Sequence, residues 1–587
     1  MSWTKPSRMA HTRILPLLFL FSFSVVVAKP VLPIRIQGAA GGGSKLDLAK
    51  IGGNSFRTWD VDENTGKLLD EAEKYGMKVM LGIWLGHERH GFDYTDFDQV
   101  VKQQEKVRKA VMAYKDHPAV LCWALGNEME GYDEGSNPAI WSHIEAMANL
   151  VKRIDPKHPV ATVIAEIGGR KVEAIHKLCP SVDIVGINSY GGVKSLPKRY
   201  RELGGRKPYI VTEYGPPGTW ESPKTSFGAI IEKTSTEKAK WYGAAYRALD
   251  ADPLCLGSYA FTWGYKQEGT ATWFGMLLPG NRRVAATDVL QELWTGKPPV
   301  NRCPTIQPLK LVGGASNQTE QGQTITIELS SSDPEGDTIK TEWILADESL
   351  DYNTGGDFRE SPNTFPGALR KTSSTSATIK MPANGGIFRV YATVTDSNGG
   401  AATASLPLFV KGPRKAPEAS QLQLPYLIVG GRAVAKHRYY PTGWMGNTVA
   451  MDLNEAYADD PLSDDKHLRF QYKANDGWGG IVWQHPPNDW GDKPGGFDLT
   501  GAQKLSFRAK GEQGGEVITI SMGIIGRDKP HFDTAKAEQK FTLSKDWKTY
   551  SLDLSSKDLS RIKSGFCIVV AGQGKPLAVQ IDDVKYH

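Results

Sequence analysis

The feature that most constrains the fold is a regular alternation of short apolar segments and amphipathic segments over residues 31–298. The apolar segments have strand character, and the stretches between them repeat apolar residues at helical spacing. The expected strands are 33–36, 55–59, 78–84, 121–125, 161–164, 183–187, 209–212 and 256–261. The expected helices include 66–74, 96–114, 139–154, 236–249 and 287–294. Eight such units favour a closed (β/α)8 TIM barrel, an α/β fold, over an open doubly wound sheet.

The rest of the chain changes its pattern at two proline-containing linkers, near residues 297–306 and 411–417. Between them, residues 305–412 alternate as strands and carry turn clusters, which predicts an immunoglobulin-like β-sandwich. We expect this domain to act as a spacer, with contact to carbohydrate as the alternative. Residues 420–587 are again strand-rich and hold many aromatic side chains, which predicts a β jelly-roll domain.

The N-terminal residues 1–28 have the pattern of a signal peptide. Basic residues precede the apolar run 14–27, and Ala28 satisfies the small-residue rule at a cleavage site. A membrane anchor is the alternative, but the run is short for a span of ~20 residues. We therefore expect a secreted, periplasmic or cell-surface protein with no membrane span after cleavage.

Composition argues against several other classes of protein. The net charge of +5 is spread along 587 residues without a Lys/Arg block, so nucleic acid is not an expected partner. The five cysteines are scattered and form no CxxC motif, which speaks against a disulfide framework or a zinc site of that type. Cys122 lies in an expected strand and Cys255 stands at the start of another, so we expect both to be small buried hydrophobic residues.

Two of the expected strands end in a glutamate. The run 120–125 leads to Asn127 and Glu128, and the run 208–212 leads to Glu213. A carboxylate at the end of a buried strand is costly unless it is used or well hydrogen-bonded. Strands four and seven lie across a barrel from each other, and barrel active sites form at the strand C-termini. The pair is typical of the acid/base and nucleophile of a sugar-cleaving enzyme, with a capping role for Glu128 as the alternative.

Other side chains are expected around this pair. Arg57, late in the second strand, is expected to hold Glu213 ionised or to form a salt bridge at the barrel mouth, and Tyr190 to donate a hydrogen bond to Glu213. His87 follows the third strand near a second histidine, but the spacing is not that of HExxH, so we expect substrate contact rather than a metal site. Glu130 is the alternative acid to Glu128.

Together these motifs resemble clan A of the glycoside hydrolases. The catalytic barrel of family 2 is the most similar, with family 5 and the fungal β-1,3-glucanosyltransferases as relatives. The resemblance covers residues 31–296 and rests on Asn54-Ser-Phe-Arg57-Thr-Trp59, Asn127-Glu128, Asn188-Ser-Tyr190, Val211-Thr-Glu213-Tyr-Gly215 and Phe261-Thr-Trp263-Gly264.

The resemblance implies roles for these residues. Glu128 would be the acid/base and Glu213 the nucleophile of a double displacement, with no organic cofactor. Asn127 would bind the sugar 2-hydroxyl, and Trp263 would form the floor under the sugar at the cleavage point. Trp273, after the last strand, is expected either on the leaving-group side or in the core.

The C-terminal domain resembles the jelly-roll carbohydrate-binding modules attached to bacterial β-glucanases. The likeness rests on residues 475–483, 505–511, 547–552 and 581–583. Flat aromatic faces bind sugar rings, so Trp478, Trp483 and Trp490 are expected either in sugar binding or in the core. Such modules often hold a structural calcium, for which Asp452, Glu455 and Asp583 are the candidates.

The sequence thus predicts a secreted, retaining β-glycoside hydrolase or transglycosylase that acts on a β-glucan or a related β-linked oligo- or polysaccharide. The alternative is a non-catalytic carbohydrate-binding protein or surface adhesin built on a degenerate barrel. Sugar identity, linkage, exo- or endo-action, and hydrolysis versus transfer stay open.

Overall fold

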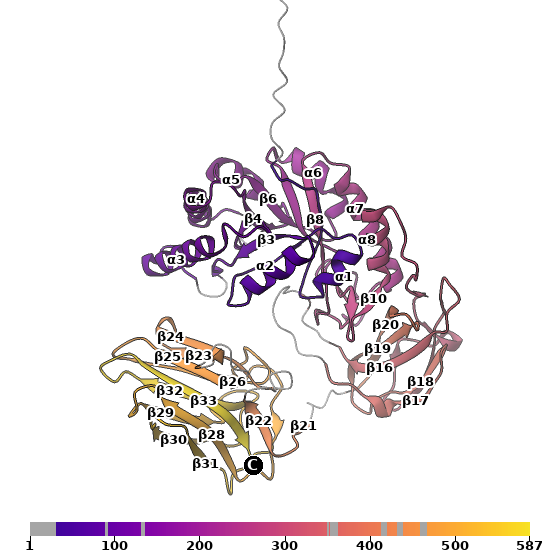
Figure 1. Ribbon diagram of the computed structural model, residues 1–587. Coiled ribbons are helices and arrows are strands. Elements are labelled where there is room, and N and C mark those ends of the chain that lie inside the picture. The colour runs from indigo at the N-terminus through magenta and orange to yellow at the C-terminus, as the bar shows by residue number, and fades with distance from the viewer. Residues whose placement is uncertain are drawn as a thin grey trace, which may run out of the picture. The chain divides into compact units, whose positions relative to one another are not determined.

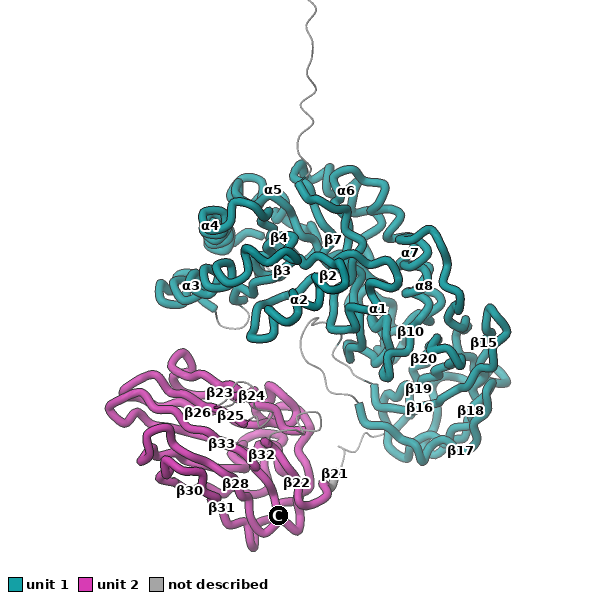
Figure 2. Tube along the Cα trace, viewed as in Figure 1, with its two compact units in different colours: residues 1–413 teal, residues 414–587 magenta. Residues whose placement is uncertain are grey.

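The computed structural model describes residues 31–88, 92–130, 135–348, 352, 362–412, 420–430, 438–457, 459 and 467–587. The expected signal peptide, residues 1–28, lies outside these residues. The chain forms two compact units, 1–413 and 414–587 (Figure 2). Within the described ranges, no helix has the length and apolar character that crossing a membrane requires.

The first unit begins with a closed barrel of eight parallel strands in sequential order, which confirms the predicted fold class (Figure 1). The strands are β1 (Ile36–Ala40), β2 (Ser55–Arg57), β3 (Lys78–Ile83), β4 (Val120–Leu125), β5 (Val160–Ala165), β6 (Ile184–Asn188), β7 (Tyr209–Tyr214) and β8 (Cys255–Phe261). The helices outside the barrel are α1 (Lys45–Lys50), α2 (Thr65–Lys74), α3 (Phe97–Tyr114), α4 (Pro138–Ile154), α5 (Lys171–Leu178), α6 (Leu196–Glu202), α7 (Ser235–Asp250) and α8 (Ala285–Thr295). The first expected strand lies too early in the chain, and no ranges were predicted for α1, α5 and α6.

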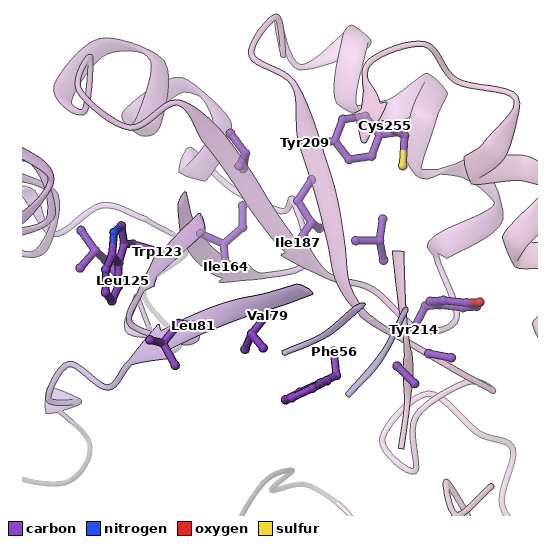
Figure 3. Packing of buried hydrophobic residues seen from close by; sticks show 14 of the residues in the cluster. Phe56, Val79, Leu81, Trp123, Leu125, Ile164, Ile187, Tyr209, Tyr214 and Cys255 are labelled. Carbon is purple, nitrogen blue, oxygen red and sulfur yellow. The ribbon is translucent and has the colours of Figure 1, made fainter. Parts of the chain in front are cut away.

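Alternation along the strands divides the apolar residues of the barrel into two cores. One core lies between the strands and the helices, and Figure 3 shows part of it, with Val79 and Leu81 on β3 and Trp123 and Leu125 on β4. The other contains alternate residues of the same strands, such as Met80 on β3. Because successive side chains of a strand point to opposite faces, Phe56 joins the outer core while its neighbour Arg57 faces the barrel interior.

Helices α3, α4 and α7 begin at side chains that cap their free backbone N–H groups. Asp96 accepts hydrogen bonds at the start of α3, and Asn137 does so before Pro138 at the start of α4. At α7, Thr234 and Glu237 form a capping box in which each side chain accepts from the other's backbone. These residue types satisfy donors that the helix itself leaves open, so each helix starts at a defined residue after its loop.

The β-sandwich is continuous with the barrel. A hairpin between β8 and α8, made of β9 (Leu277–Leu278) and β10 (Arg282–Val284), extends a sandwich sheet in the order β16-β19-β20-β10-β9. In that sheet β16 is Lys340–Asp347, β19 is Gly386–Thr395 and β20 is Gly400–Val410. The facing sheet has the order β12-β14-β18-β17, with β12 at Lys310–Leu311, β14 at Thr324–Glu328, β18 at Ser376–Lys380 and β17 at Leu369–Thr372. The domain expected to act as a spacer therefore shares a sheet with the barrel.

A buried ion pair within the sandwich also contacts the barrel. Arg389 on β19 makes two hydrogen bonds of 2.6 Å to Glu348, and both side chains are at most 1% exposed. The same guanidinium donates to the backbone oxygen of Ile230 in the loop between β7 and α7, at 2.7 Å. A buried charge that loses its partner is far more costly than an exposed one. The loop between β7 and α7 is thus anchored to the sandwich.

Replacement of Arg389 by methionine is expected to lower the free energy of unfolding by about 3–5 kcal/mol, because Glu348 would remain as a buried charge without its cation. Removing both charges in the double variant Arg389→Met/Glu348→Leu should recover much of this loss. Urea unfolding measures both effects. The control Arg302→Met breaks the more exposed 2.8 Å pair with Glu335 and should cost about 0–1 kcal/mol. Equal losses in the free energy of unfolding for Arg389→Met and Arg302→Met would show that burial of the Arg389 pair does not increase its contribution.

The second unit is built of two packed antiparallel sheets, as predicted for a jelly roll. One has the order β24-β25-β33-β28-β31, with β22 also paired to β33, and the other has the order β23-β26-β32-β29-β30. The strands of the first sheet are β22 (Tyr426–Val429), β24 (Met451–Tyr457), β25 (His467–Tyr472), β28 (Lys504–Gly511), β31 (Lys548–Asp553) and β33 (Leu577–Tyr586). Those of the second are β23 (Tyr440–Gly446), β26 (Trp478–Gln484), β29 (Val517–Met522), β30 (Ala537–Thr542) and β32 (Ser564–Ala571).

All five cysteines are buried and none is paired in a disulfide. Cys122 and Cys255 lie in β4 and β8, which confirms the prediction that they are buried strand residues. Burial raises the pKa of the Cys122 thiol to about 12, so this group stays protonated at neutral pH.

Candidate active site

Glu213, near the end of β7, is held by three donors from two other strand ends. Its Oε1 accepts from Arg57 at 3.2 Å and from the Trp59 indole at 3.0 Å, and its Oε2 accepts from the Tyr190 hydroxyl at 2.7 Å. Arg57 and Glu213 are both buried, and their ion pair satisfies each charge inside the barrel. The structure therefore brings Arg57, Tyr190 and Glu213 together, as predicted from their positions in the strands.

Asn188, the last residue of β6, connects this carboxylate to the second one. Its Oδ1 accepts from Arg57 at 3.2 Å and from the Thr212 hydroxyl at 2.7 Å. Its Nδ2 donates to Glu128 at 2.6 Å and to Asn127 at 3.2 Å. Because both ends of this amide are occupied, its orientation is determined by the network. Asn127 receives a further hydrogen bond of 3.0 Å from Arg57, so Asn127 also lies in the cluster.

Glu128 follows β4 in a left-handed backbone conformation, with φ of 55°. For a residue other than glycine this conformation costs about 1–3 kcal/mol and is concentrated at functional sites. Its backbone N–H donates to the Val163 oxygen at 2.9 Å, which fixes the turn to β5. Burial, together with the negative charge of Glu213, raises the pKa of Glu128 to about 7.

The two glutamates thus have unequal surroundings. Glu213 faces a guanidinium and two further donors, whereas Glu128 has one side-chain donor and a raised pKa. Carboxylates in such unequal surroundings can serve as a proton donor and an anion at the same pH. The Tyr190 hydroxyl has a pKa raised well above its usual value, chiefly by burial, and it remains a neutral donor. The arrangement is suited to acid/base and nucleophilic chemistry at one bond.

Trp263 does not lie with the glutamates, contrary to its expected position beneath the sugar. It comes two residues after β8 ends, and its indole N–H donates to the Ser44 oxygen at 2.9 Å in the outer core. Phe261, the last residue of β8, belongs to the inner core instead. Its ring centroid lies 6.0 Å from that of Tyr190 and 6.3 Å from that of Trp59. The aromatic side chain that β8 brings to this cluster is therefore Phe261.

The remaining barrel candidates lie in three different surroundings. His87 is buried and stacks on Trp84 with ring centroids 4.7 Å apart. Trp273 belongs to the inner core with Phe261, and its indole donates to the Pro217 oxygen at 3.0 Å, so of the two predicted roles the structure supports a core position. Glu130 is buried in a 3.2 Å ion pair with Lys171, which points to a structural role for this carboxylate.

In the second unit, two of the three tryptophans expected to bind sugar are exposed. Trp478 and Trp490 present accessible side chains, whereas Trp483 is buried in the core and cannot offer a face to a ligand. The three calcium candidates do not group together. Asp452 pairs with Lys473 at 3.1 Å and Asp583 with Lys585 at 2.8 Å. No cluster of three or more His, Cys, Asp or Glu side chains suited to a metal occurs among the residues that the structure describes.

Sequence reasoning missed three members of the site, namely Asn188, Trp59 and Phe261. All three stood inside the motifs quoted around Tyr190, Arg57 and Trp263. Their signal was a polar or aromatic residue at the C-terminal end of a barrel strand, the same signal that identified Glu213. Phe261 could have been found from its position as the final residue of a strand in which Tyr259 also faces the interior.

Comparison with known proteins is consistent with this geometry. Residues 50–227 match the family model described as glycosyl hydrolases family 2, TIM barrel domain. This barrel resembles the catalytic barrel of glycoside hydrolase family 2. The matched residues of the family 2-like barrel include Arg57, Glu128 and Glu213, and the predicted resemblance is confirmed.

Among curated proteins, a putative mannan endo-1,4-β-mannosidase 9 of Oryza sativa subsp. japonica is 26% identical over 252 residues, which cover 35% of this chain and 59% of the relative. A β-glucuronidase of Paenibacillus borealis is 24% identical over 195 residues, which cover 29% and 30% of the two chains. A solved β-D-glucuronidase from Dictyoglomus thermophilum matches with a TM-score of 0.37 and 20% identity, over 46% of this chain and 51% of that one. This chain spans about three fifths or less of the length of each of these three proteins.

Proposed function

We propose that this protein is a retaining β-glycosidase that acts on a β-linked oligo- or polysaccharide. It cleaves the glycosidic bond that lies between the side chains of Glu128 and Glu213. The observation that carries the proposal is the unequal pair of glutamates, one with a pKa raised to about 7 and the other bound by Arg57, Trp59 and Tyr190. Glycosidases of this kind need one carboxyl group as proton donor and a second as anion, and in a retaining enzyme that anion is the nucleophile. The relatives named as a mannosidase and a glucuronidase support a glycoside as the substrate class.

The proposed reaction is a double displacement. The Glu213 carboxylate attacks the anomeric carbon while Glu128 donates its proton to the leaving oxygen, which gives a covalent glycosyl ester on Glu213. Glu128, now an anion, then removes a proton from water, whose oxygen attacks the same carbon and releases Glu213. A sugar hydroxyl in place of water would give transfer instead of hydrolysis. Tyr190 and Arg57 hold Glu213 in place and bind its charge when it leaves.

Asn127 is proposed to bind the sugar itself. Its side-chain oxygen accepts from Arg57 and from Asn188, so its amide nitrogen is the end that can donate to a hydroxyl of the substrate. We further propose that the protein is exported, on the signal-peptide pattern of residues 1–28, and that Trp478 and Trp490 of the second unit contact polysaccharide.

Product analysis by mass spectrometry tests the proposal. The full mature chain and its Glu213→Ala variant would be incubated with β-1,2-, β-1,3-, β-1,4- and β-1,6-gluco-oligosaccharides, manno-oligosaccharides, galactans and β-glucuronides. We expect shortened products, or longer ones from transfer, that disappear with the variant. Turnover that survives in the variant would overturn the assignment of Glu213. Binding without turnover on the whole panel would favour the non-catalytic carbohydrate-binding alternative.

The pH dependence of the reaction should report on Glu128. With a pKa near 7, its proton is present below pH 7 and is lost as the pH rises through 7. The rate on substrates with a sugar leaving group is therefore expected to fall above about pH 7. The residual rate of the Glu128→Gln variant should lack this decline. If the decline were unchanged in the variant, its cause would be the titration of another group.

The same shift predicts an effect on stability. The folded protein holds the Glu128 proton more tightly than the unfolded chain, so stability should decrease as the pH rises from about 4.5 to 7. In thermal unfolding, the stability of Glu128→Gln relative to the native protein should therefore be higher at pH 8 than at pH 4.5.

A further inference from the structure

One large aromatic side chain near the glutamates is exposed and has no part in the reaction proposed above. Trp220 lies in the loop between β7 and α7, which spans residues 215–234, and its side chain is 42% exposed. Its ring meets that of Tyr190 edge to face, with centroids 5.6 Å apart and an interplanar angle of 89°. Tyr190 in turn donates to Glu213 at 2.7 Å. Trp220 is thus one side chain away from the proposed nucleophile.

The backbone around Trp220 is held by hydrogen bonds on both sides. One carboxylate oxygen of Glu221 accepts from the backbone N–H groups of Gly218 and Gly191, each at 2.8 Å. Because Gly191 follows Tyr190 directly, Glu221 ties the Trp220 loop to the loop that carries Tyr190. On the other side, the Thr219 hydroxyl donates to the Tyr352 oxygen at 2.9 Å.

The indole also lies directly on Gly218. A Cβ at position 218 would come within 2.4 Å of the Trp220 ring, so the absence of a side chain there lets the ring rest on the backbone. Together with the hydrogen bond from Arg389 to the Ile230 oxygen, these contacts anchor the loop at several points. A ring held in place before the ligand arrives loses little conformational freedom on binding.

From these contacts we propose that Trp220 is a stacking platform for a second sugar unit of the substrate, next to the unit bound between the glutamates. An exposed indole can stack on the C–H groups of a pyranose ring, and this one contacts Tyr190, which donates to the proposed nucleophile. The ligand is therefore a β-linked chain of at least two sugars. This inference rests on the proposed glycosidase function and adds a chain-length requirement to it.

The test compares short and long substrates in the full-length protein. For Trp220→Ala and Trp220→Leu, kcat/KM on an oligosaccharide cleaved by the native protein should fall about 10- to 100-fold, mainly through KM. For Trp220→Phe, which keeps a flat ring, kcat/KM on the same oligosaccharide should fall less. On an aryl glycoside of a single sugar, the three variants should match the native protein within about twofold. Tyr75→Ala, at the end of α2, removes a partly exposed aromatic ring at the far end of the barrel and serves as the control.

Binding gives a second readout that does not depend on turnover. In a Glu213→Ala background, titration calorimetry with the same oligosaccharide should show that Trp220→Leu weakens binding by a similar factor. Native-like kinetics and binding of the Trp220 variants on the long substrate would overturn the platform while leaving the glycosidase proposal intact. A native protein that neither cleaves nor binds any oligosaccharide of the panel would overturn both.

Discussion

Replacement of Glu213 by alanine is expected to abolish turnover, with kcat lower by about 10⁴-fold or more. The variant keeps Arg57, Trp59 and Tyr190 but loses the carboxylate that all three hydrogen-bond, so no covalent sugar ester can form. Steady-state kinetics on the substrate found by product analysis measure the loss.

Added azide gives a sharper result for Glu213→Ala. The small anion can occupy the position of the missing carboxylate and attack the anomeric carbon in one displacement, which inverts the configuration. The expected product is an α-glycosyl azide. The control is Glu130→Gln, which removes a buried carboxylate paired with Lys171 and is expected to affect stability far more than kcat. A Glu213→Ala protein with native kcat would rule out its role as nucleophile.

The Glu128→Ala variant should show a loss that depends on the leaving group. On substrates with a sugar leaving group, which needs a proton, kcat is expected to fall about 10²- to 10⁴-fold. On a dinitrophenyl glycoside, whose leaving group departs as an anion, formation of the glycosyl-enzyme should be much less affected. The measurement is the ratio of the two rates in the native and variant proteins.

Azide separates the two glutamates. In Glu128→Ala the sugar is still transferred to Glu213, and azide then attacks this ester in a second displacement that restores the β-configuration. The two variants are thus expected to give glycosyl azides of opposite configuration. The assigned roles would be wrong if both variants gave the same anomer. They would also be wrong if Glu128→Ala lowered the rate equally on substrates with either leaving group.

The barrel could be predicted from the sequence because its signals are local and repeated. Seven of the eight expected strands overlap the observed ones closely, since each is a short apolar run bounded by loops. The first was placed three residues early, where Pro33 and Ile34 precede the true start at Ile36. The short helices α1, α5 and α6 carry too few turns for a helical period to stand out.

The union of barrel and sandwich could not be predicted in the same way. It depends on the pairing of Arg283 and Val284 in β10 with Gly400 and Ala401 in β20, more than a hundred residues apart. The sequence of neither strand indicates which strand it pairs with, because pairing depends on tertiary structure. The ion pair between Arg389 and Glu348 is hidden for the same reason, since charged residues in a sequence are ordinarily exposed.

Within the active site, the residues at or near strand ends were predicted correctly, whereas the position of Trp263 was not. Arg57, Asn127, Glu128, Tyr190 and Glu213 were identified from their places at or near strand ends, and the structure brings all five together. The role of Trp263 was implied by the family resemblance of a motif just beyond β8. The chain turns there, as shown by the hydrogen bond of 2.7 Å from the Trp263 backbone N–H to the Ala40 oxygen, and the indole enters the outer core. A residue beyond the last ladder pair no longer follows the alternation of the strand.

We propose that Glu128 and Glu213 cleave a β-glycoside with retention of configuration. The most direct test is proton NMR of the reaction as it starts, recorded before the free sugar equilibrates between its anomers. With retention, the β-anomer of the newly released reducing end appears first and the α-anomer grows in later. If the α-anomer appeared first, cleavage would be inverting, and Glu213 would have to be reassigned as the base that activates water.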